Sequence, residues 1–112
     1  MSTASVTDLR RQLDQCWEMG RIGQSTEGLV EAQRLLVLAR RSTDRLAMAQ
    51  AHTCNAWFCL QMGYADEGLD CALEAIEIYR DSNEVRGQAL AMSVYSWLLL
   101  ELGLSDMGYE QA

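Results

Sequence analysis

The chain has 112 residues, nearly half of them apolar, and a formal net charge of −7 at pH 7. This length suits one compact domain, and the apolar content is enough for a core. No apolar run approaches the roughly 20 residues of a membrane span, and the polar N-terminus lacks an apolar signal region. We therefore expect a cytoplasmic protein that has no membrane partner.

The charged residues exclude several kinds of function. All nine basic side chains are arginine, which excludes a Schiff-base lysine and a Walker-type phosphate loop. Residues 1–45 hold seven arginines against six acids, a net of +1, whereas residues 46–112 hold two against ten, a net of −8. An acidic second half disfavours binding to nucleic acid, so we expect no nucleic-acid partner.

The absence of proline and the abundance of good helix formers predict an all-α fold. In chain order, the apolar spacing predicts helices near residues 5–22, 25–41, 44–62, 66–80 and 83–102. We expect Ser42 or Thr43 to cap the third helix. Asp66 should provide a cap or a negative charge at the start of the fourth. The third helix is apolar on nearly all sides, as expected for an inner helix, while the fourth is amphipathic.

A period of forty residues runs through these helices. Its members are one tryptophan and two glycines per unit: Trp17, Gly23 and Gly28, then Trp57, Gly63 and Gly68, then Trp97, Gly103 and Gly108. Residues 49–72 and 89–112 agree at eight of 24 positions. A fixed period of about 20–50 residues is typical of stacked repeats, each of which cannot bury its apolar face alone.

The two glycine series have different expected roles. The first glycine of each unit should end the first helix in the left-handed conformation. The second falls early in the second helix, where glycine costs about 0.5–1 kcal/mol relative to alanine. Its recurrence predicts a close approach of the two helices of each hairpin, against the small residues Cys16, Ala56 and Ser96.

A small residue, a glycine seven positions later and a small residue five further on resemble the tetratricopeptide repeat. The residues that carry this likeness are Ala56, Gly63 and Gly68 in the second unit and Ser96, Gly103 and Gly108 in the third. The resemblance implies a right-handed α-hairpin solenoid of about two and a half repeats. It would form one domain over residues 1–112, with repeats near residues 5–42, 43–82 and 83–112.

The unit departs from that family in three ways: its period is 40 residues instead of about 34, it lacks the closing proline, and Ala72 stands where the family has a large residue. Longer units without proline resemble the helical repeats of bacterial regulators. These include peptide-sensing regulators and the N-terminal regions of some diguanylate cyclases, and the opening residues 9–20 look closest to the latter. The resemblance thus implies a regulatory region of a bacterial signalling protein.

In the tetratricopeptide family, the first helices line a concave surface that binds proteins or peptides. The resemblance places ten candidate partner-binding residues on that surface: Arg10, Trp17, Arg21, Gln50, Thr53, Trp57, Gln61, Ser93, Trp97 and Glu101. Because buried aromatic side chains are common binding anchors, the tryptophans could grip a peptide or helix. The alternative is that they only pack between successive first helices. Exposed rings would favour binding, and fully buried rings would favour a scaffold.

Few residues suggest catalysis or a cofactor. His52 is the only histidine, and the carboxylate pairs fit a solvated helix face. Because no CxxC motif occurs, we expect the cysteines to be small buried residues and not metal ligands: Cys16, Cys54, Cys59 and Cys71. We expect no metal, no cofactor and no catalytic activity in these residues.

The sequence reaches Ala112 early in the expected second helix of the third unit. By analogy with residues 66–80, some helical residues would be missing, and several leucines would lose their cover: Leu98, Leu99, Leu100, Leu102 and Leu104. We expect a fragment that hides this surface by self-association. The predicted function is a noncatalytic interaction or sensory module, and the alternative is a homo-oligomerisation scaffold without a separate ligand.

Overall fold

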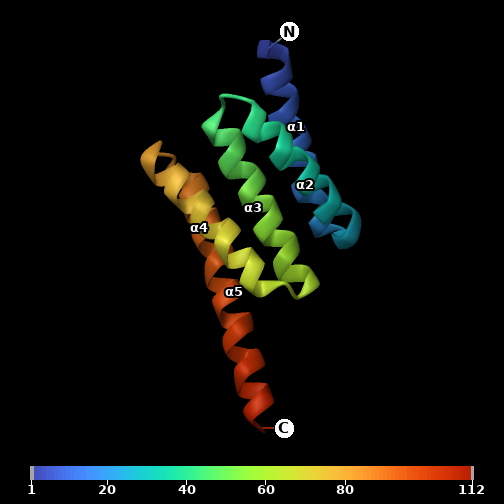
Figure 1. The fold of residues 1–112 in the computed structure, drawn as a ribbon, viewed down its shortest axis with the longest axis vertical. Coiled ribbons are helices and arrows are strands. Elements are labelled where there is room, and N and C mark those ends of the chain that lie inside the picture. The colour runs from blue at the N-terminus through green and yellow to red at the C-terminus, as the bar shows by residue number, and fades with distance from the viewer. Residues whose placement is uncertain (1, 112) are drawn as a thin grey trace.

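The computed structural model describes the backbone of residues 2–111 and the side chains of residues 8–103. Five α-helices follow one another, with no strand between residues 2 and 111: α1 (Ser2–Arg21), α2 (Ser25–Arg41), α3 (Arg45–Met62), α4 (Ala65–Asp81) and α5 (Val85–Gln111) (Figure 1). The all-α fold is therefore confirmed, and the first four helices lie within three residues of their predicted bounds. In the described part of the chain, no helix is long and apolar enough to cross a membrane.

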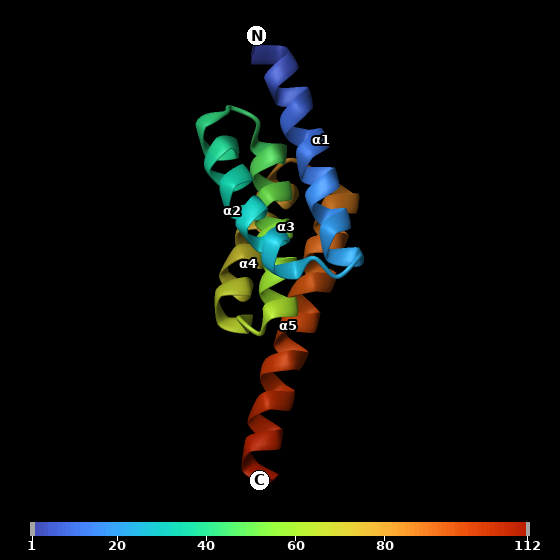
Figure 2. The same cartoon turned by 90° about the vertical axis from the view of Figure 1, so that its right-hand side faces the viewer.

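The helices are arranged in two layers around α3. The central helix α3 packs against each of the other four helices. Figure 2 shows α2 and α4 on one side of α3, with α1 and α5 on the other. The second helices α2 and α4 thus lie on one side of α3, and the first helices of the neighbouring units, α1 and α5, lie on the other (Figure 2). Short turns connect successive helices, which makes neighbours in the chain antiparallel.

The turns within the first two hairpins, α1–α2 and α3–α4, use the same backbone geometry. Gly23 and Gly63 have φ angles of 86° and 83°, the left-handed conformation expected for them. In each turn, the N–H of the residue after the glycine donates to a carbonyl five positions earlier, at 2.9 Å from Gln24 and 2.8 Å from Tyr64. Because only glycine adopts this φ without strain, the first glycine of each unit fixes where the hairpin bends.

The start of α3 differs slightly from its prediction. The capping side chain is Asp44, which accepts a hydrogen bond from the N–H of Leu46 at 3.1 Å. Ser42, expected as a cap, instead accepts from the N–H of Asp44 at 3.2 Å. The start of α4 has no side-chain cap, but Asp66 and Glu67 place negative charge in its first turn, as expected.

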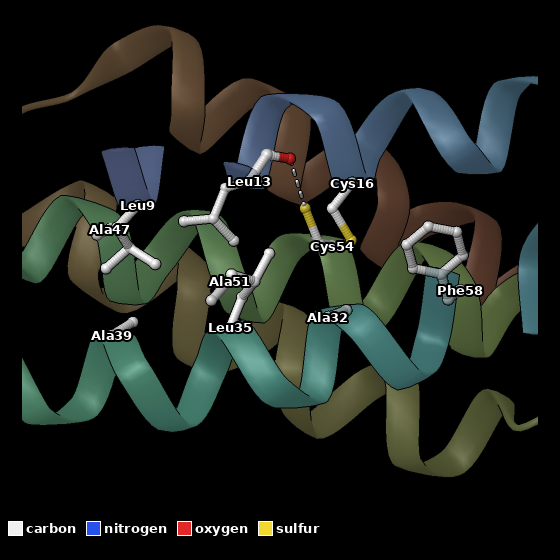
Figure 3. Packing of buried hydrophobic residues seen from close by; sticks show 10 residues of the cluster. All are labelled: Leu9, Leu13, Cys16, Ala32, Leu35, Ala39, Ala47, Ala51, Cys54 and Phe58. Carbon is white, nitrogen blue, oxygen red and sulfur yellow. Dashed lines mark hydrogen bonds between the residues drawn. The ribbon is translucent and has the colours of Figure 1, made fainter. Parts of the chain in front are cut away.

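The buried core repeats with the forty-residue period. Figure 3 shows one cluster, to which α1, α2 and α3 all contribute. Ala32, Cys54 and Phe58 belong to this cluster, and the residues forty positions later belong to the next one: Ala72, Val94 and Leu98. Of the cysteines, Cys71 is half-buried and the others are buried. The core residues of the first hairpin therefore predict those of the second.

Gly28 and Gly68, the second glycines of the first two units, lie against the following unit. A Cβ atom at Gly28 would collide with the ring of Phe58. A Cβ at Gly68 would lie 2.8 Å from Leu98 Cδ2 and 3.0 Å from Cys59 Cβ. The close approach thus involves the next first helix as well as the helix partner expected from the sequence. Glycine is tolerated within these second helices because no larger side chain fits there.

The third unit does not form its predicted hairpin. Instead of ending at residue 102, α5 continues through Gly103 and past position 108 to Gln111. Gly103 also lacks the positive φ of Gly23 and Gly63. The predicted turn is therefore wrong in this structure, as is the start of a second helix near Gly108. The helix continues through Gly103 because the neighbouring residues 100–102 are good helix formers, and one glycine costs only about 1 kcal/mol.

The leucines expected to lose their cover divide into two groups. Leu98 is buried and Leu102 is half-buried, so for these two residues the expectation is wrong. Both belong to or contact a core cluster between α3, α4 and α5. Leu99 and Leu100 are exposed, as expected. Leu104 lies outside the residues whose side chains are described.

Two alanine substitutions test the difference between Gly63 and Gly103. Gly63→Ala should lower the free energy of unfolding by about 1–2 kcal/mol, because alanine is strained at positive φ. Gly103→Ala should raise it by about 0.5–1 kcal/mol, because the site is helical and nothing lies within 4 Å of the added Cβ. Urea denaturation at low protein concentration measures both. If the two variants lose stability equally, residue 103 lies in a turn.

Candidate functional site

Three tryptophans from three helices lie in contact, and we call them the tryptophan ladder. The ring of Trp17 in α1 stacks on that of Trp57 in α3, with centroids 5.0 Å apart and planes inclined at 22°. Trp57 meets Trp97 of α5 at 6.0 Å and 45°. The forty-residue period produces this row, because it puts one tryptophan at the same level of each first helix. Aromatic pairs at such distances contribute about 0.5–1.5 kcal/mol beyond their buried area.

The rings are neither fully buried nor fully exposed. Trp17 and Trp57 are half-buried, whereas Trp97 is 48% exposed. Gly20 lies so close to Trp57 that a Cβ there would collide with the indole ring. The indole N–H of Trp57 is buried without a hydrogen-bond partner among the described residues. Trp57 therefore acts as a packing residue, while Trp97 offers ring surface to the outside.

A groove lies beside the ladder, over α3 and between α1 and α5. Two adjoining hollows of about 280 and 400 Å³ form it, and we call them together the central groove. Asp14, Gln50 and Tyr79 line both hollows. The first hollow also reaches Trp17 of the ladder and Leu90 of α5. A larger hollow of about 530 Å³ lies between α1 and α2. None of the ten candidate partner-binding residues lines it.

The structure brings together most of the ten candidate residues. Arg10, Trp17, Gln50 and Thr53 line the central groove, and Trp57 and Trp97 complete the ladder. The other four lie apart from the groove lining: Arg21, Gln61, Ser93 and Glu101.

Three of these four make contacts within the fold. Arg21 pairs with Glu18 on α1 at 3.0 Å. Gln61 accepts a hydrogen bond from the Ser25 hydroxyl, which joins two units. The Ser93 hydroxyl donates to a carbonyl of its own helix. Glu101 is exposed on α5. These interactions give Arg21, Gln61 and Ser93 local structural roles.

Sequence reasoning missed Tyr79, which comes from the end of α4 and lines both hollows. It was overlooked because only the first helices were expected on this surface. The one sign of Tyr79 in the sequence is Gly87, a glycine near the start of α5. In the structure, this glycine leaves room for the Tyr79 ring, with which a Cβ would collide. Burial raises the pKa of the Tyr79 phenol to about 12, so it stays neutral at physiological pH. Tyr79 therefore supplies an uncharged wall.

The charges of the groove are mixed. Arg10 donates two hydrogen bonds to Asp44, at 2.6 and 2.7 Å. This pairing raises the pKa of Arg10, lowers that of Asp44, and leaves the positive charge of Arg10 largely balanced. Glu84 and Arg86, of opposite charge, line the same hollow as Arg10.

Of the described side chains that line the hollow beside the ladder, one is an unpaired carboxylate. Asp14 accepts a hydrogen bond from the Gln50 amide at 2.6 Å, and no described cationic side chain pairs with it. Glu18 lines the same hollow but is paired with Arg21. The open charge at this end of the groove is therefore that of Asp14.

His52 and Cys59 do not line the groove. His52 is buried in α3, and its Nδ1 has no partner in the described part of the chain. Burial lowers the pKa of this imidazole, with opposing smaller effects from Glu74 and Arg40. Burial also raises the pKa of the Cys59 thiol to about 11, which disfavours a reactive thiolate. Among the described residues, no three side chains of the metal-binding types cluster together.

No protein-family model, curated protein or solved structure matches the chain. The resemblance to tetratricopeptide repeats therefore stays a prediction. The candidate site rests on the ladder, the groove and their charges.

Trp57→Ala tests whether the ladder holds the fold together. We expect it to lower the free energy of unfolding by about 2–4 kcal/mol, because it removes both ring contacts and leaves a cavity beside Gly20. Trp97→Ala should cost less, since half of that ring is already in water. Urea denaturation of both variants makes the comparison. An unchanged Trp57→Ala midpoint would show that the ring does not stabilise the stack.

His52 should make stability depend on pH. Its folded-state pKa lies below the unfolded value of about 6.5, so the unfolded state binds the proton more readily. Stability should be fully present above about pH 6.5 and should fall as the pH drops through the lower, folded-state pKa. His52→Met, which introduces the residue found at position 92, should flatten this dependence. Urea midpoints at about pH 7.5 and 5.5 test it; an equal fall in both proteins would assign the effect to other groups.

Proposed function

We propose that the chain is a noncatalytic interaction module whose central groove and tryptophan ladder bind a peptide or helix of a partner protein. The observation that carries this proposal is a ladder that meets an open groove at Trp17 and ends in the half-exposed Trp97. Large aromatic side chains dominate the binding energy of many protein interfaces. A rigid ladder also loses little conformational freedom when a partner binds, which favours affinity.

The chemistry of the groove supports a particular kind of ligand. Asp14 presents a carboxylate close to Trp17, whereas Glu18 is paired with Arg21 and the charge of Arg10 with Asp44. A basic ligand residue would be attracted by the Asp14 carboxylate and could lie over an indole ring, a contact worth about 0.5–2 kcal/mol. Leu90 offers an apolar contact on the opposite wall. The ligand we propose is therefore a peptide with neighbouring basic and apolar residues.

The resemblance to N-terminal regions of bacterial signalling proteins supports a regulatory role. In this proposal, the module lies in the cytoplasm and passes its bound state to another domain of a diguanylate cyclase-like protein or a peptide-sensing regulator. The absence of a spanning helix in the described residues is compatible with that setting. The alternative function, a homo-oligomerisation scaffold, is favoured by exposed apolar residues on α5, among them Val85, Met92 and Leu99.

Selection of peptides tests the proposal. The probe is a displayed library of random peptides of about 12 residues, a length that spans roughly 36–40 Å when extended. Peptides enriched on the whole chain should contain basic residues next to apolar ones, and fluorescence anisotropy gives their dissociation constants. Trp97→Ala should weaken binding by about tenfold or more, as expected for an aromatic anchor.

Tyr64→Ala is the matched control, because Tyr64 is 47% exposed and lies in a turn away from the groove. This variant should bind the selected peptides as the wild type does. Melting curves of both variants establish that the fold is retained. Failure to enrich any peptide, or equal weakening by the two substitutions, would contradict groove binding.

A further inference from the structure

One face of α5 is apolar and exposed from residue 85 to residue 103. Its six residues alternate in spacings of four and three, and we call them the α5 seam: Val85, Ala89, Met92, Ser96, Leu99 and Gly103. All six are exposed, including Val85 at 73%, Met92 at 50% and Leu99 at 46%. None of them is charged. This alternation of four and three is the pattern of a helix that packs along another helix.

The second unit shows what covers such a face. Four seam positions correspond, forty residues earlier, to α3 residues that are buried: Ala49, His52, Ala56 and Cys59. The second helix α4 covers that face, since clusters join Ala49 to Ala75 and Ala56 to Ala72. From Ala49 to Ala56 along α3, the residue number of the α4 partner falls from 75 to 72, so the covering helix runs antiparallel to α3. The seam thus matches a surface that elsewhere in this chain lies under an antiparallel helix.

We propose that a second copy of the chain covers the seam, through an antiparallel pair of α5 helices related by a two-fold axis. The pattern of the seam is symmetric about residue 94. In an antiparallel pair, Val85 lies opposite Gly103 of the second copy, Ala89 opposite Leu99, and Met92 opposite Ser96. Each layer then combines one large and one small side chain, which is how facing helices fill space without clashes.

Charge and shape both favour a second copy as the occupant. A two-fold axis brings identical surfaces together, so a charged face would repel itself, and the seam carries no charge. Exposed Leu100, at 59%, lies beside the seam and widens the apolar surface. The nineteen positions from 85 to 103 extend over about 28 Å of helix, which allows several successive layers to interlock. No seam residue lines the central groove, so the inference stands independently of peptide binding.

Sedimentation equilibrium of the whole chain tests the pairing over about 1–200 µM, a range suited to micromolar affinities. The expected mass is twice 12.6 kDa, falling toward the single-chain value on dilution. Leu99→Arg should shift the equilibrium to monomer, with at least about a tenfold larger dissociation constant, because it buries an unpaired charge between the two helices.

Val37→Arg is the matched control, because Val37 is also 46% exposed but lies on α2. It should leave the dimer intact, and circular dichroism checks that both variants fold. A monomeric wild type at every concentration would overturn the proposal, whatever else covers the seam. Equal dissociation by the two variants would overturn it as well.

Cross-linking tests the direction of the pair. The double variant Met92→Cys with Ser96→Cys should form interchain disulfides on mild oxidation, because these positions face each other within disulfide reach, about 7 Å between Cα atoms. Ser96→Cys alone should cross-link less, because the two introduced cysteines of the pair are offset by about one helical turn along the helix axis. The wild type, with its native cysteines, is the blank. Stronger cross-linking of the single variant would indicate a parallel pair and overturn the proposal.

Discussion

The fold depends on the small side chains of α3. Its buried residues include Ala47, Ala49, Ala51, Cys54 and Ala56, which together let helices approach from several directions. A helix with large side chains on every face could not contact four neighbours at once, because interhelical distances follow the size of the side chains between them. The sequence of α3 is therefore apolar on nearly all faces of the helix because α3 is surrounded by four other helices.

The tryptophan ladder follows from that packing. When the first helices of successive units lie side by side, one tryptophan per unit forms a continuous row. Trp57, in the middle, has ring neighbours on both sides, whereas Trp97 has one and remains half exposed. Trp57 therefore packs inside the row, whereas Trp97 has ring surface that a partner can contact. The difference comes only from their positions along the row. A partner that contacts Trp97 would extend the row by one layer.

The sequence predicted the features that repeat. The period located the first four helices, and Gly23 and Gly63 located two turns, because a left-handed residue is a local requirement. Gly103 failed as a turn signal because glycine permits the left-handed conformation without requiring it, and the residues around Gly103 are good helix formers. The capping role of Asp44 was missed because its carboxylate is also held by Arg10, 34 positions away.

The groove was harder to predict than the ladder. Thr53 and Gln50 were found because they lie on a first helix, where the family resemblance places its contacts. Tyr79 lies at the end of a second helix and enters the groove only because Gly87 leaves space for its ring. Such a contact depends on two residues in different units and on the crossing of their helices. Spacing within one unit cannot predict it.

The α5 seam differs from its counterpart on α3 in a way that bears on its partner. Where α3 has His52 and Cys59, α5 has Met92 and Leu99, which are larger or more apolar. The helix over α3 supplies small residues such as Gly68 and Ala72, and Cys59 already lies close to Gly68. A helix that packs on Met92 and Leu99 must likewise offer small residues at the facing positions. Ser96 and Ala89 of a second copy satisfy that requirement, so α5 is complementary to itself.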